Sequence, residues 1–320
     1  MGFEGLRLRW RGARAVALIA SVALVVPLAG SGSAVSSARA SKRISVVAAF
    51  YPLAEVAQQV GGRDVTVHNL TPAGAEPHDL ELASDQVDLV LGARIVIVMG
   101  KGFQPSVEAA AKQGNGVTVS VLSRLTAVKS KGKRVAPNGT VAPNALDPHV
   151  WLDPVLMRSV VDIVKNALVK ADPHHAAAYR ANAANYSAKV ATLDADYRRG
   201  LAACKRKLIV TSHEAFGYLA KEYRLRQVGI TGIDPEAEPD PEHLAQLTKL
   251  VKRRHVTTIF TESLVSPKVA QTLAREAGGL RTEVLNPLEG LTDLQVSQGE
   301  NYLSVMRTNL MKLREALGCT

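Results

Sequence analysis

Three histidines and one glutamate are the side chains of this sequence best suited to metal chemistry. Three neutral imidazoles and one carboxylate make a four-coordinate shell that Zn²⁺ accepts, with nitrogen and oxygen donors at about 2.0 to 2.2 Å. The four residues are far apart along the chain, so only the tertiary structure could assemble them. They are His78 in Glu-Pro-His-Asp, His149 in Asp-Pro-His-Val-Trp-Leu-Asp-Pro, His213 directly after Leu-Ile-Val-Thr, and Glu289 in Asn-Pro-Leu-Glu-Gly.

A simpler interpretation exists for each of these residues, because a loop histidine near a proline is often a solvated surface residue. We expect the five other histidines to be structural or exposed. Asp153 and Glu214 lie beside the candidates and could orient an imidazole or act in the first turn of a helix. For Asp153, directly before Pro154, helix capping is the favoured role. The five histidines are His68, His174, His175, His243 and His255.

Strands and helices alternate in both halves of the chain, which predicts an α/β fold with largely parallel sheets. Ligands of such sheets bind outside the carboxyl ends of the strands, so two sheet-containing lobes predict a metal site in the cleft between them. The expected strands are 44–50, 65–70, 95–99 and 117–121 in the first half, and 208–211, 227–230, 257–260 and 283–285 in the second.

One long helical segment separates the two halves. Residues 173–203 carry apolar or small side chains at helical spacing over a length that a single small lobe does not need. We therefore expect two parallel-sheet lobes joined by one long rigid helix. The predicted organisation is a signal peptide at 1–40, an N-terminal lobe at 41–172, the linking helix at 173–203 and a C-terminal lobe at 204–320.

The first forty residues have the order of a secretory signal. Arginines precede an apolar block at 15–29, and small residues follow up to Ala38-Arg39-Ala40. An uncleaved single anchor is the alternative, and either leaves the rest of the chain outside the cytoplasm. Disulfides persist there, so the two cysteines, Cys204 and Cys319, are expected to pair.

Composition excludes several classes of protein. The 320 residues are 47% hydrophobic and 21% charged, which is typical of a soluble globular chain of about two domains. No later apolar run matches the first, which excludes a multi-pass membrane protein. The net charge of +10 is spread along the chain, with clusters at 129–134 and 252–254, and aromatic residues are only 4%. Nucleic-acid binding is therefore not expected.

Several phrases, taken in order, resemble the metal-binding solute receptors of ABC importers, specifically the zinc group called cluster A-I. The resemblance covers residues 44–317 and implies an extracytoplasmic receptor, acting as a monomer, that captures Zn²⁺ and delivers it to an ABC permease. It also supports the cysteine pairing. The phrases are GAEPHDLELASDQ, DPHVWLDP, TSHEAFGYLAKEYRL, IFTESLVSPKVAQTLAREAG and VLNPLEGLT.

The resemblance also implies a ligand set. His78, His149 and His213 match the three histidines of that family, whereas the manganese receptors place a glutamate where His213 stands. Many members have an aspartate before Pro-Leu, where this chain has Asn286, so the fourth role passes to Glu289, with Asn286 or water as alternatives. Three nitrogens and one carboxylate favour Zn²⁺ over Mn²⁺, whereas Cu²⁺ would bind more tightly still by intrinsic affinity.

Two departures from the family pattern limit what is implied. The loop at 127–146 has no histidine, so a metal-capturing role for it is not expected. Ser31 stands where many members carry a lipid-attachment cysteine, so we expect a secreted or periplasmic protein without a lipid there. The alternatives are a zinc hydrolase with Glu76 or Glu214 as general base, and a metal-dependent adhesin. We expect no enzyme, since the sequence has no HExxH helix and no GxSxG turn.

Overall fold

The computed structural model describes residues 43–125 and 147–320, which belong to one compact unit spanning residues 41–320. The predicted signal peptide, the serine at position 31, the basic cluster at 129–134 and the whole loop at 127–146 lie outside the described residues. The domain boundaries proposed above stay predictions.

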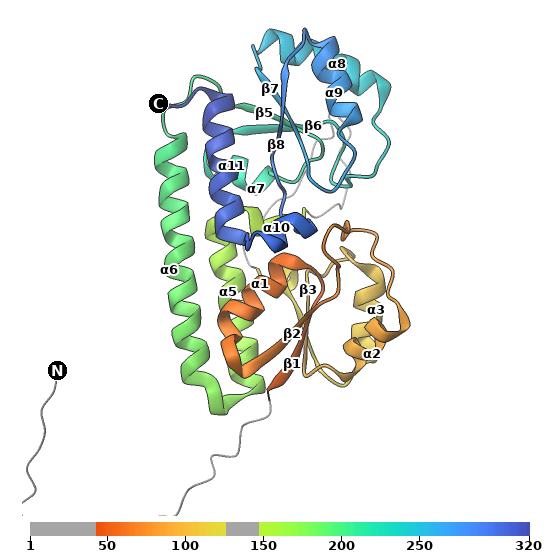
Figure 1. The fold of residues 1–320 in the computed structure, drawn as a ribbon, viewed down its shortest axis with the longest axis vertical. Helices are drawn as coiled ribbons and strands as arrows, with labels where there is room; N and C mark the ends of the chain where they lie inside the picture. The colour runs from red at the N-terminus through yellow and green to blue at the C-terminus, as the bar shows by residue number, and fades with distance from the viewer. Residues whose placement is uncertain (1–42, 126–146) are drawn as a thin grey trace, which may run out of the picture. The chain divides into compact units, whose positions relative to one another are not determined.

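Two four-stranded parallel sheets have the same strand order (Figure 1). In both, the strand that comes first in the chain pairs with the second and the third, and the fourth lies at an edge. The first sheet has the order β2-β1-β3-β4 and the second β6-β5-β7-β8. The strands are β1 Ile44–Ala48, β2 Val65–Asn69, β3 Ile95–Val98 and β4 Val117–Ser120, then β5 Leu208–Thr211, β6 Arg226–Gly229, β7 Thr258–Thr261 and β8 Arg281–Val284.

Helices connect successive strands on the faces of each sheet, as parallel pairing requires. The predicted α/β fold with two parallel-sheet lobes is thus confirmed. In the N-terminal lobe the helices are α1 Tyr51–Gly61, α2 Ser84–Gly92, α3 Pro105–Gln113, α4 Val121–Arg124 and α5 Pro154–Ala171, with 3₁₀ turns at Gly62–Asp64 and Val150–Leu152. In the C-terminal lobe they are α7 Gly217–Glu222, α8 Pro241–Arg253, α9 Lys268–Glu276, α10 Asp293–Ser297 and α11 Tyr302–Leu317.

The predicted long helix is α6, Ala176–Leu201, and a 3₁₀ turn at Pro173–His175 precedes it. It packs against α1 and α5 of the N-terminal lobe and against α11 (Figure 1). Its buried side chains recur every three or four residues, as expected for a helix that buries one face. They are Tyr179, Ala183, Tyr186, Val190, Leu193, Tyr197 and Leu201.

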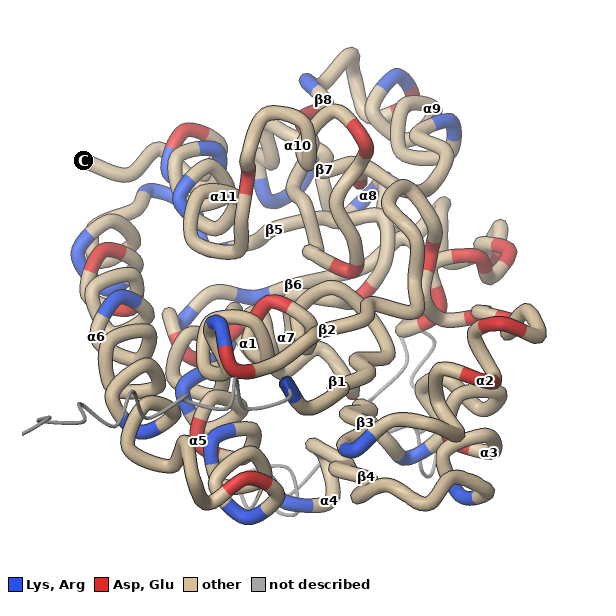
Figure 2. Tube along the Cα trace, turned by 60° about the horizontal axis from the view of Figure 1, so that its bottom comes forward, with Lys and Arg blue, Asp and Glu red and all other residues tan. Residues whose placement is uncertain are grey.

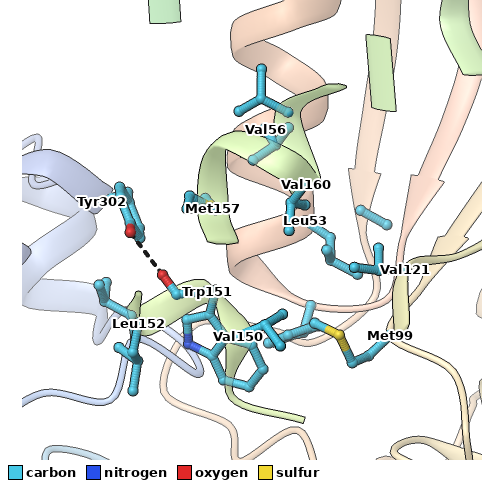
Figure 3. Packing of buried hydrophobic residues seen from close by; sticks show 14 of the residues in the cluster. Leu53, Val56, Met99, Val121, Val150, Trp151, Leu152, Met157, Val160 and Tyr302 are labelled. Carbon is cyan, nitrogen blue, oxygen red and sulfur yellow. Dashed lines mark hydrogen bonds between the residues drawn. The ribbon is translucent and has the colours of Figure 1, made fainter. Parts of the chain in front are cut away.

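The largest buried side chain of the N-terminal lobe, Trp151, lies between the first sheet and the C-terminal helix. Leu53, Met99 and Val121 belong to the same apolar cluster (Figure 3). The hydroxyl of Tyr302, the first residue of α11, donates to the carbonyl oxygen of Trp151 at 2.7 Å. The last helix of the chain is therefore anchored in the core beside the first lobe.

The chain ends in two helices, α10 and α11, which a short turn separates. Gly299 has a φ of 71°, and Asn301 then caps α11 by accepting from the backbone N–H groups of Leu303 and Ser304. The left-handed glycine ends the first helix and the asparagine starts the second.

The predicted disulfide between Cys204 and Cys319 is present. It ties the segment after α6 to the residues that follow α11. None of the helices in the described part of the chain is both long and apolar enough to span a membrane.

Candidate metal centre

His78 lies in the loop that leaves β2, at the carboxyl edge of the first sheet. Its backbone N–H donates to Glu76 Oε2 at 2.8 Å, and its ring packs edge-on against Phe103, with 4.6 Å between the ring centroids. The same loop touches the C-terminal lobe, where the Gly74 backbone N–H donates to the Leu291 carbonyl at 2.9 Å. The loop is thus held from both sides of the cleft.

His149 is fully buried immediately before the 3₁₀ turn that leads into α5. Asp147 Oδ1 accepts two hydrogen bonds from it, one from the backbone N–H at 3.1 Å and one from ring Nδ1 at 2.8 Å. Two residues further on, Trp151 Nε1 donates to the Pro287 carbonyl at 2.8 Å. The His-Val-Trp phrase therefore carries one cleft-facing imidazole and one contact to the opposite lobe.

His213 follows β5, one of the two internal strands of the second sheet, and it is also fully buried. Glu262 lies directly after the neighbouring strand β7 and uses both of its oxygens on this residue. Oε1 accepts from the backbone N–H at 3.0 Å, and Oε2 lies 2.7 Å from ring Nδ1. The carboxylate therefore sets both the position and the ring orientation of His213.

Glu289 is buried in the loop after β8, with 1% of its surface exposed. The preceding residue, Leu288, has a φ of 56°, a backbone conformation that favours glycine. Asn286 holds this loop: its side-chain oxygen accepts from the Leu288 backbone N–H at 2.7 Å, and its backbone groups bond to the side chain of Asn309. Asn286 thus shapes the loop that presents Glu289.

The four residues predicted from sequence meet at one point. One potential ligand atom from each lies within 4.8 Å of all the others. Glu289 Oε1 is 3.2 Å from His78 Nε2 and 3.1 Å from Nε2 of both His149 and His213. A tetrahedral zinc shell with bonds of about 2.0 to 2.1 Å places its ligand atoms about 3.3 to 3.4 Å apart. These contacts are therefore close to the edges of such a tetrahedron.

Nδ1 of both His149 and His213 faces a carboxylate, and an ionised carboxylate can accept a hydrogen bond but cannot donate one. Each neutral ring therefore carries its proton on Nδ1, and Nε2 is left with a lone pair. The two Nε2 atoms lie 3.2 Å apart, and both face the oxygen of Glu289. Three lone pairs directed at the same point repel one another unless a cation lies between them. In the metal-free protein, protons on the two Nε2 atoms would serve, and a metal ion would replace them.

The electrostatics of the centre agree with this description. Burial by itself would lower the pKa of His149, but its hydrogen bonds to Asp147 and Glu289 outweigh burial and raise it. Burial would also lower the pKa of His213, yet the charges of Glu289 and Glu262 raise it well above its usual value. The pKa of Glu289, which burial would raise, is instead held well below its usual range, chiefly by His213.

A second carboxyl lies near the centre. Burial raises the pKa of Glu76 to about 7, and its Oε1 is 3.9 Å from His78 Nε2. Oε1 is buried and has no hydrogen-bond partner among the described residues.

Asp153 has the favoured capping role, because its side chain accepts from the Val155 backbone N–H at 2.8 Å.

The remaining histidines lie outside the group of four. His175 Nδ1 contacts Asp172 at 2.5 Å, and His243 Nε2 lies 2.9 Å from the Gly229 carbonyl. Two supporting residues had no assigned role in the sequence analysis, Asp147 and Glu262. An acidic residue directly after a strand was a usable signal for Glu262, because the ends of β5 and β7 are neighbours in the sheet.

Comparison with known proteins agrees with this fold. The family described as zinc-uptake complex component A, periplasmic, matches residues 46–316. The chain belongs to this family. The predicted relation of the sequence to the zinc receptors of ABC importers is thereby confirmed.

Two relatives illustrate the similarity in sequence. The high-affinity zinc uptake system protein ZnuA of Bacillus subtilis is 34% identical over 316 residues, 97% of this chain and 98% of that protein. The zinc-binding protein AdcA of Streptococcus pyogenes is 37% identical over 297 residues, which are 86% of this chain but 56% of AdcA. The chain thus spans about half the length of AdcA.

The structure resembles the crystal structure of the Zn(II)-bound ZnuA-like domain of Streptococcus pneumoniae AdcA. The TM-score is 0.71 at 34% sequence identity, and the match covers 86% of this chain and 99% of that domain.

Proposed function

We propose that this protein is an extracytoplasmic zinc receptor that captures Zn²⁺ and delivers it to an ABC permease. The ligands are Nε2 of His78, His149 and His213 and one carboxylate oxygen of Glu289. The observation that carries the proposal is the convergence of these four atoms to within 4.8 Å, two of the rings being oriented by carboxylates behind them. Similar proteins are named for zinc binding and zinc uptake, which supports the same ion.

The donor set fits zinc and a carrier. Three imidazole nitrogens and one carboxylate oxygen are softer and carry less charge than a shell of two nitrogens and two carboxylates, which favours Zn²⁺ over Mn²⁺. Four protein ligands fill a tetrahedral shell and leave no open position for a reactive water. A catalytic zinc site keeps such a position open, so transport is favoured over hydrolysis.

The division of the shell between the lobes suggests how zinc is released. His78 and His149 belong to the N-terminal lobe, and His213 and Glu289 to the C-terminal lobe. Separating the lobes would break the shell together with the two hydrogen bonds described across the cleft, Gly74 to Leu291 and Trp151 to Pro287. Docking on a permease can supply the free energy for that separation, and α6 limits its extent. We propose that the receptor acts as a monomer and binds no nucleic acid.

Zinc titration of the purified protein and single variants tests this function. His78→Ala, His149→Ala and His213→Ala should each weaken zinc binding roughly 100-fold, because about 10 to 16 kcal/mol shared among four ligands gives about 3 kcal/mol for each. His255→Ala is the matched control and should bind zinc like the unmodified protein. X-ray absorption at the zinc edge should show three nitrogens and one oxygen.

Glu289→Gln tests the fourth ligand separately. This substitution should weaken zinc binding, because it removes the one charged ligand. The X-ray absorption spectrum should still show three imidazole ligands. An unchanged affinity would assign the fourth position to water or Asn286. Equal losses in the three histidine variants and in His255→Ala would contradict the whole ligand set.

A further inference from the structure

A cationic pocket lies at the edge of the second sheet opposite the metal centre. It has a volume of about 270 Å³ and opens where β5 and β6 begin and where α8 ends. The metal ligand His213 comes after the other end of β5. The pocket is therefore separate from the metal centre. Its cationic lining consists of Lys205, Arg206, Lys207, Arg226 and Arg254.

These five charges have no acidic counterpart in the pocket. None of its lining residues is acidic, and none of the ion pairs found among the described residues involves the five cations. Figure 2 shows basic residues between α6 and β5 and at the start of β6. Lys207 also lines a neighbouring pocket of about 280 Å³, but there Arg198 is paired with Glu222, so the unpaired cations are those of the first pocket.

The backbone that carries the first three cations is held in place. The Cys204–Cys319 disulfide precedes it. The Lys205 backbone N–H donates to the Gly318 carbonyl at 3.3 Å and that of Arg206 to the Leu317 carbonyl at 3.0 Å. Gly318 has a φ of 63°, and a Cβ there would lie 3.0 Å from Arg206 Nη2. A fixed backbone lowers the entropy cost of binding a ligand with these side chains.

The rest of the lining indicates the chemical class of the ligand. Four aliphatic side chains and Gln227 lie among the cations, and no aromatic residue lines the pocket. Guanidinium groups bind phosphate oxygens in pairs, aliphatic side chains accommodate hydrocarbon, and single-stranded nucleic acid would require aromatic surfaces for stacking. A phosphate group attached to an apolar body satisfies both parts of the lining. The aliphatic residues are Leu208, Val228, Leu250 and Val256.

We propose that this pocket binds the headgroups of anionic phospholipids and so holds the protein at a membrane surface. The family to which the chain belongs is described as periplasmic, a compartment bounded by membranes. Binding at this edge involves none of the four proposed zinc ligands. The proposal is independent of the ligand set given for zinc.

Vesicle binding tests the proposal. The protein should co-sediment with vesicles of phosphatidylcholine that contain phosphatidylglycerol, and not with vesicles of phosphatidylcholine alone. Arg226→Gln/Arg254→Gln should lower the affinity about 25-fold, because each basic residue near an anionic membrane contributes about fivefold. Both side chains are exposed, so the variant should fold. Higher ionic strength should weaken binding by the unmodified protein.

The matched control removes the same charge elsewhere. Arg158→Gln/Arg180→Gln changes two exposed arginines of α5 and α6 and should leave vesicle affinity nearly unchanged. Zinc affinity should be the same in both double variants. Equal losses of vesicle affinity in the two double variants would show that net charge alone causes binding, and would overturn the proposal that the pocket is the binding site. If inorganic phosphate binds through Arg226 and Arg254 but vesicles do not bind, the ligand of the pocket is a soluble phosphate compound. That result would overturn the proposal of membrane binding.

Discussion

The two buried imidazoles of the metal centre are held by carboxylates that act in different ways. Asp147 uses a single oxygen, Oδ1, for both the ring and the backbone N–H of His149. Glu262 uses one oxygen for the ring of His213 and the other for its backbone N–H. An amide retains one acceptor oxygen, so an amide can replace the first carboxylate but not the second.

Substituting these two carboxylates should therefore have unequal effects. Glu262→Gln places an amide NH₂ against an N–H donor and should weaken zinc binding by about 10 to 100-fold, the usual range for residues that orient a metal ligand. Asp147→Asn keeps Oδ1 and should cost less. Competitive zinc titration measures both, with the exposed Glu276→Gln as control. A larger loss in Asp147→Asn than in Glu262→Gln would contradict this account of the two hydrogen-bond patterns.

Zinc affinity should depend on pH because zinc displaces protons from the centre. The pKa values of His149 and His213 are raised in the metal-free protein, so both rings hold protons above pH 6.5, the usual histidine value. Zinc affinity should be highest at alkaline pH. As the pH is lowered, the affinity should begin to decrease before pH 6.5 is reached. The steepest fall is about 100-fold per pH unit, for two displaced protons. Titrations between about pH 5 and 8 measure this, and a flat profile would exclude histidine ligation.

At the scale of elements, the strand order explains why His213 meets the carboxylate that orients it. His213 and Glu262 follow β5 and β7, which are neighbours in the second sheet. Since parallel strands end at the same edge, a residue after each strand reaches the same cleft. The alternation of strands and helices was readable from the sequence. The pairing of β5 with β7 was not, because strands adjacent in a sheet need not be adjacent in the chain.

The disulfide closes a large part of the C-terminal lobe, with 115 residues of sequence separating Cys204 from Cys319. Loops of this length lose much conformational freedom in the unfolded chain when cross-linked. Cys204→Ser/Cys319→Ser should lower the free energy of unfolding by about 2 to 5 kcal/mol, measured by denaturant titration. Zinc affinity should change little, because the bond lies at the end of β5 away from His213. Reduction should destabilise the unmodified protein and leave the double variant unaffected.

At the scale of the whole molecule, zinc should stabilise both lobes together, because each lobe supplies two of the proposed ligands. Free zinc at 1,000 times its dissociation constant adds about 4 kcal/mol to the free energy of unfolding. In a chain of this size that raises the melting temperature by roughly 7 °C. Thermal unfolding with and without zinc measures the shift. A rise of the same size in His149→Ala/His213→Ala would show that zinc binds elsewhere.

The sequence by itself determined the alternation of strands and helices, the long helix, the cysteine pair, the family and the four candidate ligands. These depend on local periodicity and on phrases that can be recognised wherever they occur. Only the tertiary structure decided that Glu262 and Asp147 orient the rings, that Asn286 shapes a loop, and that five cations share a pocket. Such roles depend on distances between residues far apart in the chain, and packing of the sheets and helices sets those distances.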